Sequence, residues 1–389
     1  MTKFQRSLTI FIIVLGIGLS LGTLILLSSE RDFVVLYAAD VSVVHGVNPY
    51  DAPAVSELFV SLRGGQPEDY SFPLLAYPPW YLLTTFYLGW LSPALAARIW
   101  YMLNVTMIVG AVWLLTENWP LKKRALTASA SLLFLPVFGL LSVGQFTAPL
   151  LFGTALFLRS VQRESVWEAI PGLLLLTFKP NLGVWMLLAG LGWLVCQRSR
   201  CSYFYRLLGG TLLGGFLLGG VSLVFIPTWP WDYWHALRGF GAMTTFAACE
   251  TCASLSLALA AWFTGQAGMT WGILIGLGLL LLISGGIALW KRSLLRSLDA
   301  LLALVALLTL LLMPYGMDYD YILLILPFLW LARRAHRPLD WLMPGLAYFV
   351  PWLSLLLSTR QWLNISLIFS AVLLLAAMIS FHAQEASAA

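Results

Sequence analysis

Charged residues are scarce in this chain. Of its 389 residues, 60% are hydrophobic and only 10% are Asp, Glu, Lys or Arg. A soluble domain carries roughly a quarter charged residues, so an ordinary soluble fold is excluded. Apolar runs approaching the roughly 20 residues that a membrane helix needs recur from end to end. The composition predicts an all-α polytopic membrane protein, and we take residues 1–389 as a single integral domain.

Cysteines are few in this chain, and nucleotide-binding motifs are absent from it. The four cysteines are Cys196, Cys201, Cys249 and Cys252. The last two form a CxxC, but neither a second CxxC nor a histidine pair lies nearby, so we expect no metal site. A Cys249–Cys252 disulfide and two free thiols both remain open. The sequence has no P-loop or Rossmann signature and no soluble nucleotide-binding domain, and we expect no cofactor.

About twelve transmembrane helices are expected. The first follows a basic start and lacks a small-residue cleavage motif, so we expect a retained helix rather than a signal peptide. The expected segments lie near residues 5–27, 97–116, 125–142, 146–160, 167–178, 181–196, 206–226, 270–289, 298–313, 319–332, 340–357 and 362–381. Two more apolar stretches, 78–91 and 254–264, could span the membrane or lie in its interface.

The distribution of basic residues sets the expected orientation. If 78–91 and 254–264 do not span and the N-terminus is cytoplasmic, most of the 22 lysines and arginines fall on the cytoplasmic side, as the positive-inside rule requires. Both termini are then cytoplasmic. These basic loops also explain the net charge of +5, so no nucleic-acid partner is expected. Two long outer loops, about 28–96 and 227–269, form the predicted active-site face and supply outer-side juxtamembrane helices.

The run LLGGTLLGGFLLGG (207–220) carries a packing signal. It contains GxxxG at Gly210/Gly214 and at Gly215/Gly219. This spacing lets helix backbones approach closely, and we expect structural packing rather than ligand binding.

The predicted outer face collects polar residues that are distant in sequence. They are Asp32, Asp40, Tyr77, Gln145, Lys179, Asn181, Asp318 and Asp320. A transporter would place ionisable groups near the bilayer midplane, within broken helices. Clustering at the outer surface instead suits chemistry on a lipid headgroup.

The stretch ERDFVVLYAAD (30–40) contains the strongest candidate. If residues 33–45 are helical, Asp32, Leu36 and Asp40 share one face. We expect an interfacial helix with its apolar residues in lipid and its acids facing an outer cavity. Asp32 is the predicted catalytic residue, although an acid at a helix N-terminus can also be a cap. Asp40 is expected to have a supporting or structural role.

Four further stretches supply the remaining candidates. In LLAYPPWYLL (74–83), Tyr77 and Trp80 could line a sugar site or anchor the chain at the interface. In SVGQFTAPLL (142–151), Gln145 is a hydrogen-bonding group or a plain turn residue. In LLTFKPNLGV (175–184), Lys179 interrupts an apolar run, and its partner is a lipid headgroup or a bound phosphate. In LMPYGMDYDYILLILP (312–327), the role of a helix cap would explain either Asp318 or Asp320, but it explains the presence of both less well.

Taken together, DFVVLYAADVSVVHGVNPYD, YPPW, GQFTAPLL, FKPNLGV and PYGMDYDYILL resemble the family 87 glycosyltransferases over roughly residues 30–330. The resemblance implies a GT-C-type fold and use of a polyprenyl-phosphate sugar as co-substrate. It also implies that the acid after the first helix, here Asp32, is the catalytic base. Relatives often carry His in the stretch that reads DYDY here, which leaves the role of 318–321 and the sugar open.

The function expected from the resemblance is an inverting transfer of a sugar, by default mannose, to a glycolipid or envelope glycan. The enzyme would act on the outer face of a bacterial plasma membrane, among membrane lipids. Lys179, Gln145 and Arg238 would bind the donor phosphate. Asp40, Tyr77, Trp80, Asn181, Asp318 and Asp320 would contact sugar or acceptor. The alternative is a polytopic transporter or a flippase for lipid-linked sugars.

Overall fold

A computed structural model describes residues 32–70, 75–197, 201–243, 254–256, 259, 269–290, 297–313, 316–356 and 360–388. In these ranges the regular elements are α-helices and short 3-10 helices, and no strand occurs. The expected first segment at 5–27, the Cys249–Cys252 motif and most of 254–264 lie outside the described residues.

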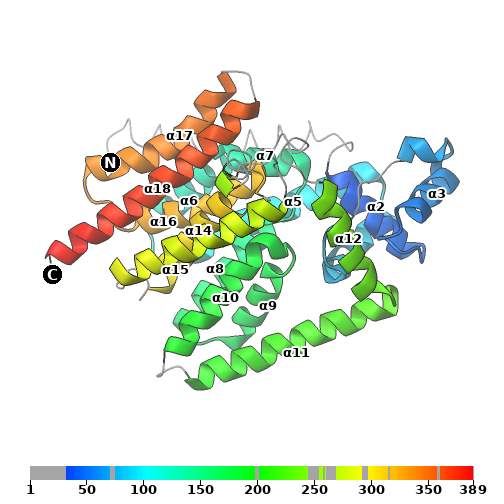
Figure 1. Ribbon diagram of the computed structural model, residues 1–389, viewed down its shortest axis with the longest axis horizontal. Coiled ribbons are helices and arrows are strands. Elements are labelled where there is room, and N and C mark those ends of the chain that lie inside the picture. The colour runs from blue at the N-terminus through cyan, green and yellow to red at the C-terminus, as the bar shows by residue number, and fades with distance from the viewer. Residues whose placement is uncertain are drawn as a thin grey trace.

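Apolar helices form a bundle that makes up most of the molecule (Figure 1). Each expected membrane segment within the described ranges coincides with a helix or a pair of helices. They are α5 (Pro93–Leu115), α6 (Leu121–Leu132), α7 (Leu135–Val143), α8 (Thr147–Arg163), α9 (Val166–Leu176), α10 (Pro180–Cys196), α11 (Cys201–Phe225), α14 (Met269–Trp290), α15 (Leu298–Leu312), α16 (Ile325–Ala332), α17 (Leu342–Leu356) and α18 (Arg360–Ala388).

Few of these helices are long enough to cross a bilayer alone. Among the described residues, three pass by length and composition, within α5, α11 and α18. The pair α6 and α7, bent by 61° at their junction, makes a fourth if it counts as one span. Of the other apolar helices, α9, α10 and α15 have fewer than 18 residues, so the structure supports a polytopic protein without confirming twelve spans.

A second group of short helices lies at one end of the bundle, on the right in Figure 1. This group, here called the end unit, comprises α2 (Phe33–Val44), α3 (Ala52–Arg63), η1 (Pro67–Tyr70), η2 (Pro79–Tyr81), α4 (Leu82–Thr85), η3 (Phe86–Trp90) and α12 (Trp229–Met243). The ambiguous stretch 78–91 therefore folds as three short helices. None of them has the roughly 20 residues of a span, which agrees with the non-spanning interpretation.

Helix α2 differs from the expected interfacial helix. Most of its residues, including Leu36 and Tyr37, are buried against protein rather than placed in lipid. The reason is that η3 packs closely on it: a Cβ on Gly89 would lie 2.5 Å from the carbonyl oxygen of Asp40. The Tyr37 hydroxyl also donates to the Leu91 carbonyl at 2.7 Å. Long-range packing has overridden the local pattern.

The first GxxxG of α11 serves the predicted packing role. A Cβ on Gly210 would collide with the Ile170 side chain, and one on Gly214 would lie 3.0 Å from Leu174. Both contacts are with α9. The second pair behaves differently, because nothing lies within 4 Å of a Cβ on Gly215, and one on Gly219 would have 3.6 Å to Trp229. Only the first motif therefore brings two helices into close backbone approach, while Gly219 of the second accepts a hydrogen bond from Trp229 Nε1 at 3.2 Å.

Helix α10 carries two glycines, Gly183 and Gly192, that allow a matched test of helix packing. Gly183 is pressed against the last turn of α9, where a Cβ would collide with the Leu176 carbonyl. We expect Gly183→Ala to lower the free energy of unfolding by about 1–3 kcal/mol through overpacking. Gly192→Ala on the same helix has open space and should be neutral or stabilising by up to about 1 kcal/mol. Thermal unfolding in one detergent checks both, and equal shifts would contradict the packing argument.

Candidate active site

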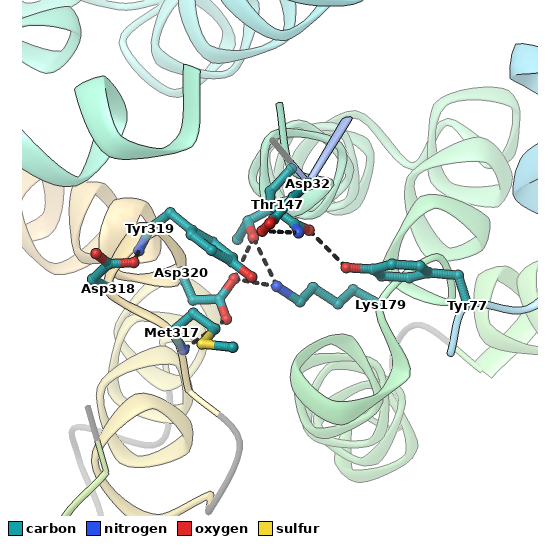
Figure 2. Close-up of polar contacts among 9 residues, drawn as sticks. Asp32, Tyr77, Thr147, Lys179, Met317, Asp318, Tyr319 and Asp320 are labelled. Atoms are coloured by element: carbon teal, nitrogen blue, oxygen red, sulfur yellow. Dashed lines mark hydrogen bonds and ion pairs between the residues drawn. The ribbon is translucent and has the colours of Figure 1, made fainter. Parts of the chain in front are cut away.

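Polar side chains from five separate stretches meet where the end unit joins the bundle (Figure 2). Asp32 immediately precedes α2, and Tyr77 lies just before η2. Gln145 and Thr147 come from the α7–α8 junction, and Lys179 is the residue before α10. Asp318 and Asp320 belong to the 3-10 helix η6 (Asp318–Leu324). Most of the predicted outer-face set is thus brought together.

The first hydrogen-bond chain orients Asp32. The Tyr77 hydroxyl donates to Gln145 Oε1 at 2.6 Å, and Gln145 Nε2 donates to Asp32 Oδ2 at 2.7 Å. Gln145 is buried, whereas Asp32 is exposed. Although Asp32 occupies the N-cap position of α2, its side chain makes no capping hydrogen bond. The carboxylate is therefore held by Gln145 and open to solvent, as a proton acceptor for a substrate must be.

The turn that carries Gln145 is fixed by its neighbours. Gly144 ends α7 in the left-handed backbone conformation, with φ of 77°. Residues other than glycine rarely adopt this conformation. A Cβ there would also lie 2.8 Å from Cβ of Phe33. Trp100 Nε1 donates to the Gly144 carbonyl at 2.7 Å, and its ring contacts that of Phe146 at 4.9 Å between centroids. Trp100 thereby positions Gln145, a role that its place in an apolar helix did not signal.

The second hydrogen-bond network is built around a buried ion pair. Lys179 Nζ lies 2.5 Å from Asp320 Oδ1, and the two side chains are 3% and 0% exposed. Nζ also donates to Thr147 Oγ1 at 3.4 Å and lies 4.8 Å from the ring centroid of Tyr319. Thr147 Oγ1 in turn donates to Asp320 Oδ1, and the backbone N–H of Met317 donates to Oδ2 at 3.1 Å. Both charges are compensated inside the protein.

This pair gives Lys179 a partner that the sequence did not suggest. The sequence suggested a lipid headgroup or a bound phosphate, whereas the structure supplies a carboxylate from η6, 141 residues away. A buried ammonium without a counter-charge would be strongly unfavourable, and Asp320 meets this requirement. Asp320 is accordingly a buried structural partner rather than an exposed sugar contact.

The two hydrogen-bond networks, one around Asp32 and one around the Lys179–Asp320 pair, meet at one turn. Gln145 and Thr147 are two residues apart, so the same short segment holds Asp32 on one side and the Lys179–Asp320 pair on the other. Helices α8 and α10 begin at Thr147 and Pro180, and helix N-termini carry partial positive charge. Two positive helix ends and an ammonium around a single buried carboxylate favour an anion nearby. Thr147 lies in the stretch GQFTAPLL, but a threonine at a helix start gives no signal in the sequence for a contact with an acid of η6.

Other predicted residues occupy the edges of this cluster or lie away from it. Asn181 and Asp318 are half-buried, and Asp318 Oδ1 accepts from the backbone N–H of Tyr319 at 2.8 Å. Trp80 Nε1 donates to Thr177 Oγ1 at 2.9 Å, and its ring meets Trp229 edge-on at 5.6 Å. Trp80 thus ties the end unit to the C-terminal end of α9 and packs on α12 within the end unit.

Arg238 lies apart from the polar cluster. It is exposed on α12, with its guanidinium 5.0 Å from the ring centroid of Trp234. It makes no described contact with Lys179 or Asp320. Its sequence position in the same outer loop as other candidates gave no information about which face of α12 it occupies.

Asp40 does not face the cavity expected from the helix pattern. It is 1% exposed and accepts from Thr85 Oγ1 at 2.7 Å. Burial raises the pKa of its carboxyl to about 8, and the hydrogen bond from Thr85 opposes this only in part. With 12 residues, α2 is too short to span a membrane. Asp40 is a core residue that holds a proton at neutral pH.

The raised pKa of Asp40 gives stability a defined pH dependence. Between about 4, the unfolded value, and about 8, the folded protein retains a proton that the unfolded chain releases. The free energy of unfolding should therefore fall as pH rises through this window, by up to about 1.4 kcal/mol per pH unit from this group. Asp40→Asn should flatten the slope. Thermal unfolding between pH 4.5 and 8.5 measures it, with the exposed Glu57→Gln as control; parallel slopes for Asp40→Asn and the parent would contradict the assignment.

Among the described residues, no group of three or more His, Cys, Asp or Glu side chains converges in a way that could hold a metal ion. The polar atoms of the cluster are instead engaged with one another and with backbone N–H groups.

The fold and the cluster define a helical integral membrane protein whose polar site lies at one end of an apolar bundle. The chain belongs to glycosyltransferase family 87, whose family model matches residues 75–314. Searches of curated proteins and of solved structures gave no match. The matched range includes Tyr77, Gln145, Thr147 and Lys179, and it establishes the protein as a membrane glycosyltransferase.

Proposed function

We propose that this protein is an inverting glycosyltransferase that takes a sugar, mannose in the first instance, from a polyprenyl-phosphate donor. The acceptor is a glycolipid or an envelope glycan at the outer face of a bacterial plasma membrane, with both termini of the enzyme cytoplasmic. The observation that carries this proposal is the exposed Asp32 carboxylate, held by Gln145 beside a buried charge cluster at two helix N-termini. Family membership supplies the reaction class.

Asp32 is the proposed general base. An acceptor hydroxyl oxygen attacks the anomeric carbon and forms the new glycosidic bond. The bond from that carbon to the phosphate oxygen breaks, and its electron pair leaves with the lipid phosphate. The hydroxyl proton passes to Asp32 Oδ1 or Oδ2. A single displacement inverts the anomeric configuration, and a catalytic base of this kind contributes about 10²–10⁴-fold to the rate.

The donor phosphate is proposed to lie against the Lys179 side of the cluster. Because Lys179 already holds Asp320, a phosphate that reaches Nζ shares the ammonium with this carboxylate. Lys179 then contributes positioning as well as charge, and Gln145 supplies an amide between the base and the phosphate region. The first turns of α8 and α10 add positive potential where negative charge develops. A direct phosphate contact by Arg238, expected from the sequence, stays a prediction, because Arg238 makes no described contact with Lys179 or Asp320.

The half-buried polar residues at the edge of the cluster, Tyr77, Asn181 and Asp318, are the proposed sugar or acceptor contacts. Each presents hydrogen-bonding groups of the kind that recognise hydroxyls. The lipid-phosphate sugar is the only co-substrate in this scheme, and no metal or organic cofactor takes part.

A transporter or flippase for lipid-linked sugars is the second candidate, favoured by one observation. Charged pairs buried in apolar surroundings, as Lys179 and Asp320 are, mark ion and substrate paths in many transporters. The two functions differ in whether a covalent product forms.

The deciding experiment uses the full chain in lipid nanodiscs. A radiolabelled polyprenyl-phosphate mannose is supplied with an extracted envelope-glycolipid acceptor, and a polyprenyl-phosphate arabinofuranose is tested in parallel. We expect a labelled glycolipid of inverted anomeric configuration from one of these donors and none from a nucleotide sugar. Retained configuration would exclude the single displacement. Movement of the donor across a liposome membrane without any labelled product would favour the flippase.

A further inference from the structure

Helix α12 has two faces of different character. Trp231, Trp234 and Arg238 are spaced by three and four residues and share one face. All three are exposed, Trp231 by 70% and Trp234 by 48%. Asp232, Tyr233 and Ala236 lie on the opposite face, where Ala236 is buried. The aromatic face is therefore largely exposed within the described part of the protein.

The inward face of α12 connects to the candidate site. Asp232 Oδ2 accepts from Asn48 Nδ2 at 2.7 Å, and the Tyr233 ring lies 6.2 Å from that of Tyr50. The Tyr50 hydroxyl donates to the Tyr77 carbonyl at 2.6 Å, and Tyr77 begins the chain that orients Asp32. The position of α12 is thus tied to the site through direct contacts.

The start of α12 lies close along the chain to the end of a candidate membrane span. Helix α11 is a candidate span over Ser202–Phe225, with only 11% of its most apolar window buried inside the protein. Its last turn exposes Val224 by 78% and Phe225 by 49%. Only three residues separate Phe225 from Trp229, the start of α12, and Figure 1 shows α12 turning away from the line of α11 at this end.

We propose that the Trp231–Trp234–Arg238 face of α12 docks on the headgroup layer of the membrane and binds an anionic phospholipid. Tryptophan concentrates at the level of lipid headgroups, where its ring is partly buried and its N–H stays hydrated. An arginine stacked on such a ring can reach a lipid phosphate with its guanidinium. The apolar end of α11 continues this surface toward the lipid chains.

Native mass spectrometry of the full chain tests this proposal without reference to catalysis. The protein is equilibrated in micelles with equal amounts of phosphatidylglycerol and phosphatidylcholine, and the retained lipids are counted. We expect preferential retention of phosphatidylglycerol, weakened about fivefold by Arg238→Gln, the change that about 1 kcal/mol per basic residue near an anionic surface represents. Arg238→Lys should retain most of the preference.

Arg63→Gln is the matched control. Arg63 is also exposed and lies 5.2 Å from an aromatic ring, that of Phe59, but it is on α3, at the far edge of the end unit in Figure 1. Its loss should leave lipid retention unchanged. Equal retention by Arg238→Gln and the parent would overturn the proposal, as would equal losses in Arg238→Gln and Arg63→Gln. A dimer mass that disappears in a Trp231→Ala/Trp234→Ala variant would assign the face to a second copy of the chain instead. Because no sugar donor is present, these outcomes are independent of the proposed reaction.

Discussion

Asp32→Asn is expected to reduce sugar transfer by about 10²–10⁴-fold, the usual contribution of a general base, while the fold stays intact. Asn has nearly the shape of Asp, and its Oδ1 can still accept the hydrogen bond from Gln145 Nε2. The side chain is exposed, so the change leaves no buried group without a partner. Only the capacity to take a proton is lost.

The measurement is the initial rate of labelled product formation by purified protein in nanodiscs, with thermal unfolding as a check on folding. Glu57→Gln provides the control, because Glu57 is an exposed acid on α3 that takes no part in the cluster. Transfer by Asp32→Asn at the rate of Glu57→Gln would remove Asp32 from the proposed role.

The second large effect concerns the Lys179–Asp320 pair. Asp320→Asn leaves a buried ammonium without a counter-charge, and Lys179→Met leaves a buried carboxylate. Each should lower the free energy of unfolding by about 3–5 kcal/mol. The double variant contains neither charge, and the amide oxygen introduced by Asp320→Asn can still accept a hydrogen bond from Met317 N–H or Thr147 Oγ1. The double variant should therefore recover most of the lost stability.

The free energy of unfolding of the parent, the two single variants and the double variant, measured in one detergent, completes a double-mutant cycle. A coupling energy of several kcal/mol is expected, and additive losses would show that the pair is not a unit. Transfer rates of the double variant then separate two roles. If the double variant recovers transfer, the role of Lys179 is to position the site through Asp320. If the double variant is stable but inactive, the charge of Lys179 acts on the donor phosphate.

Much of the fold was predictable because membrane helices are encoded locally. Length, apolar composition and helix breakers placed a helix or helix pair at each expected segment from 97–116 to 362–381 that the structure describes. The α6–α7 pair was expected as the single segment 125–142 and is bent by 61°. Pro136, one residue into α7, cannot donate a backbone hydrogen bond, which is the local reason for a break.

The candidate site was predictable in membership more than in arrangement. Asp32, Tyr77, Gln145, Lys179 and Asp320 do meet, because the topology puts the ends of their segments on one side. Their roles depended on contacts that no sequence spacing encodes. Gln145 reaches Asp32 across 113 residues, and η3 buries Asp40 against a pattern that suggested exposure. Arg238 lies on the outward face of α12, because the inward face is held by the packing of Tyr233 on Tyr50 and by the hydrogen bond from Asn48 to Asp232.

Apolar length and charge distribution were enough to show a helical membrane protein with its polar candidates at segment ends, because these properties act on each segment independently of the others. Its motifs were also sufficient for the resemblance to family 87 glycosyltransferases. Helix packing sets which acid stays in solvent, which acids are buried, and which partner neutralises Lys179. Those outcomes depend on the desolvation and pairing of charges from distant segments, and a charge has no assigned partner until the helices pack.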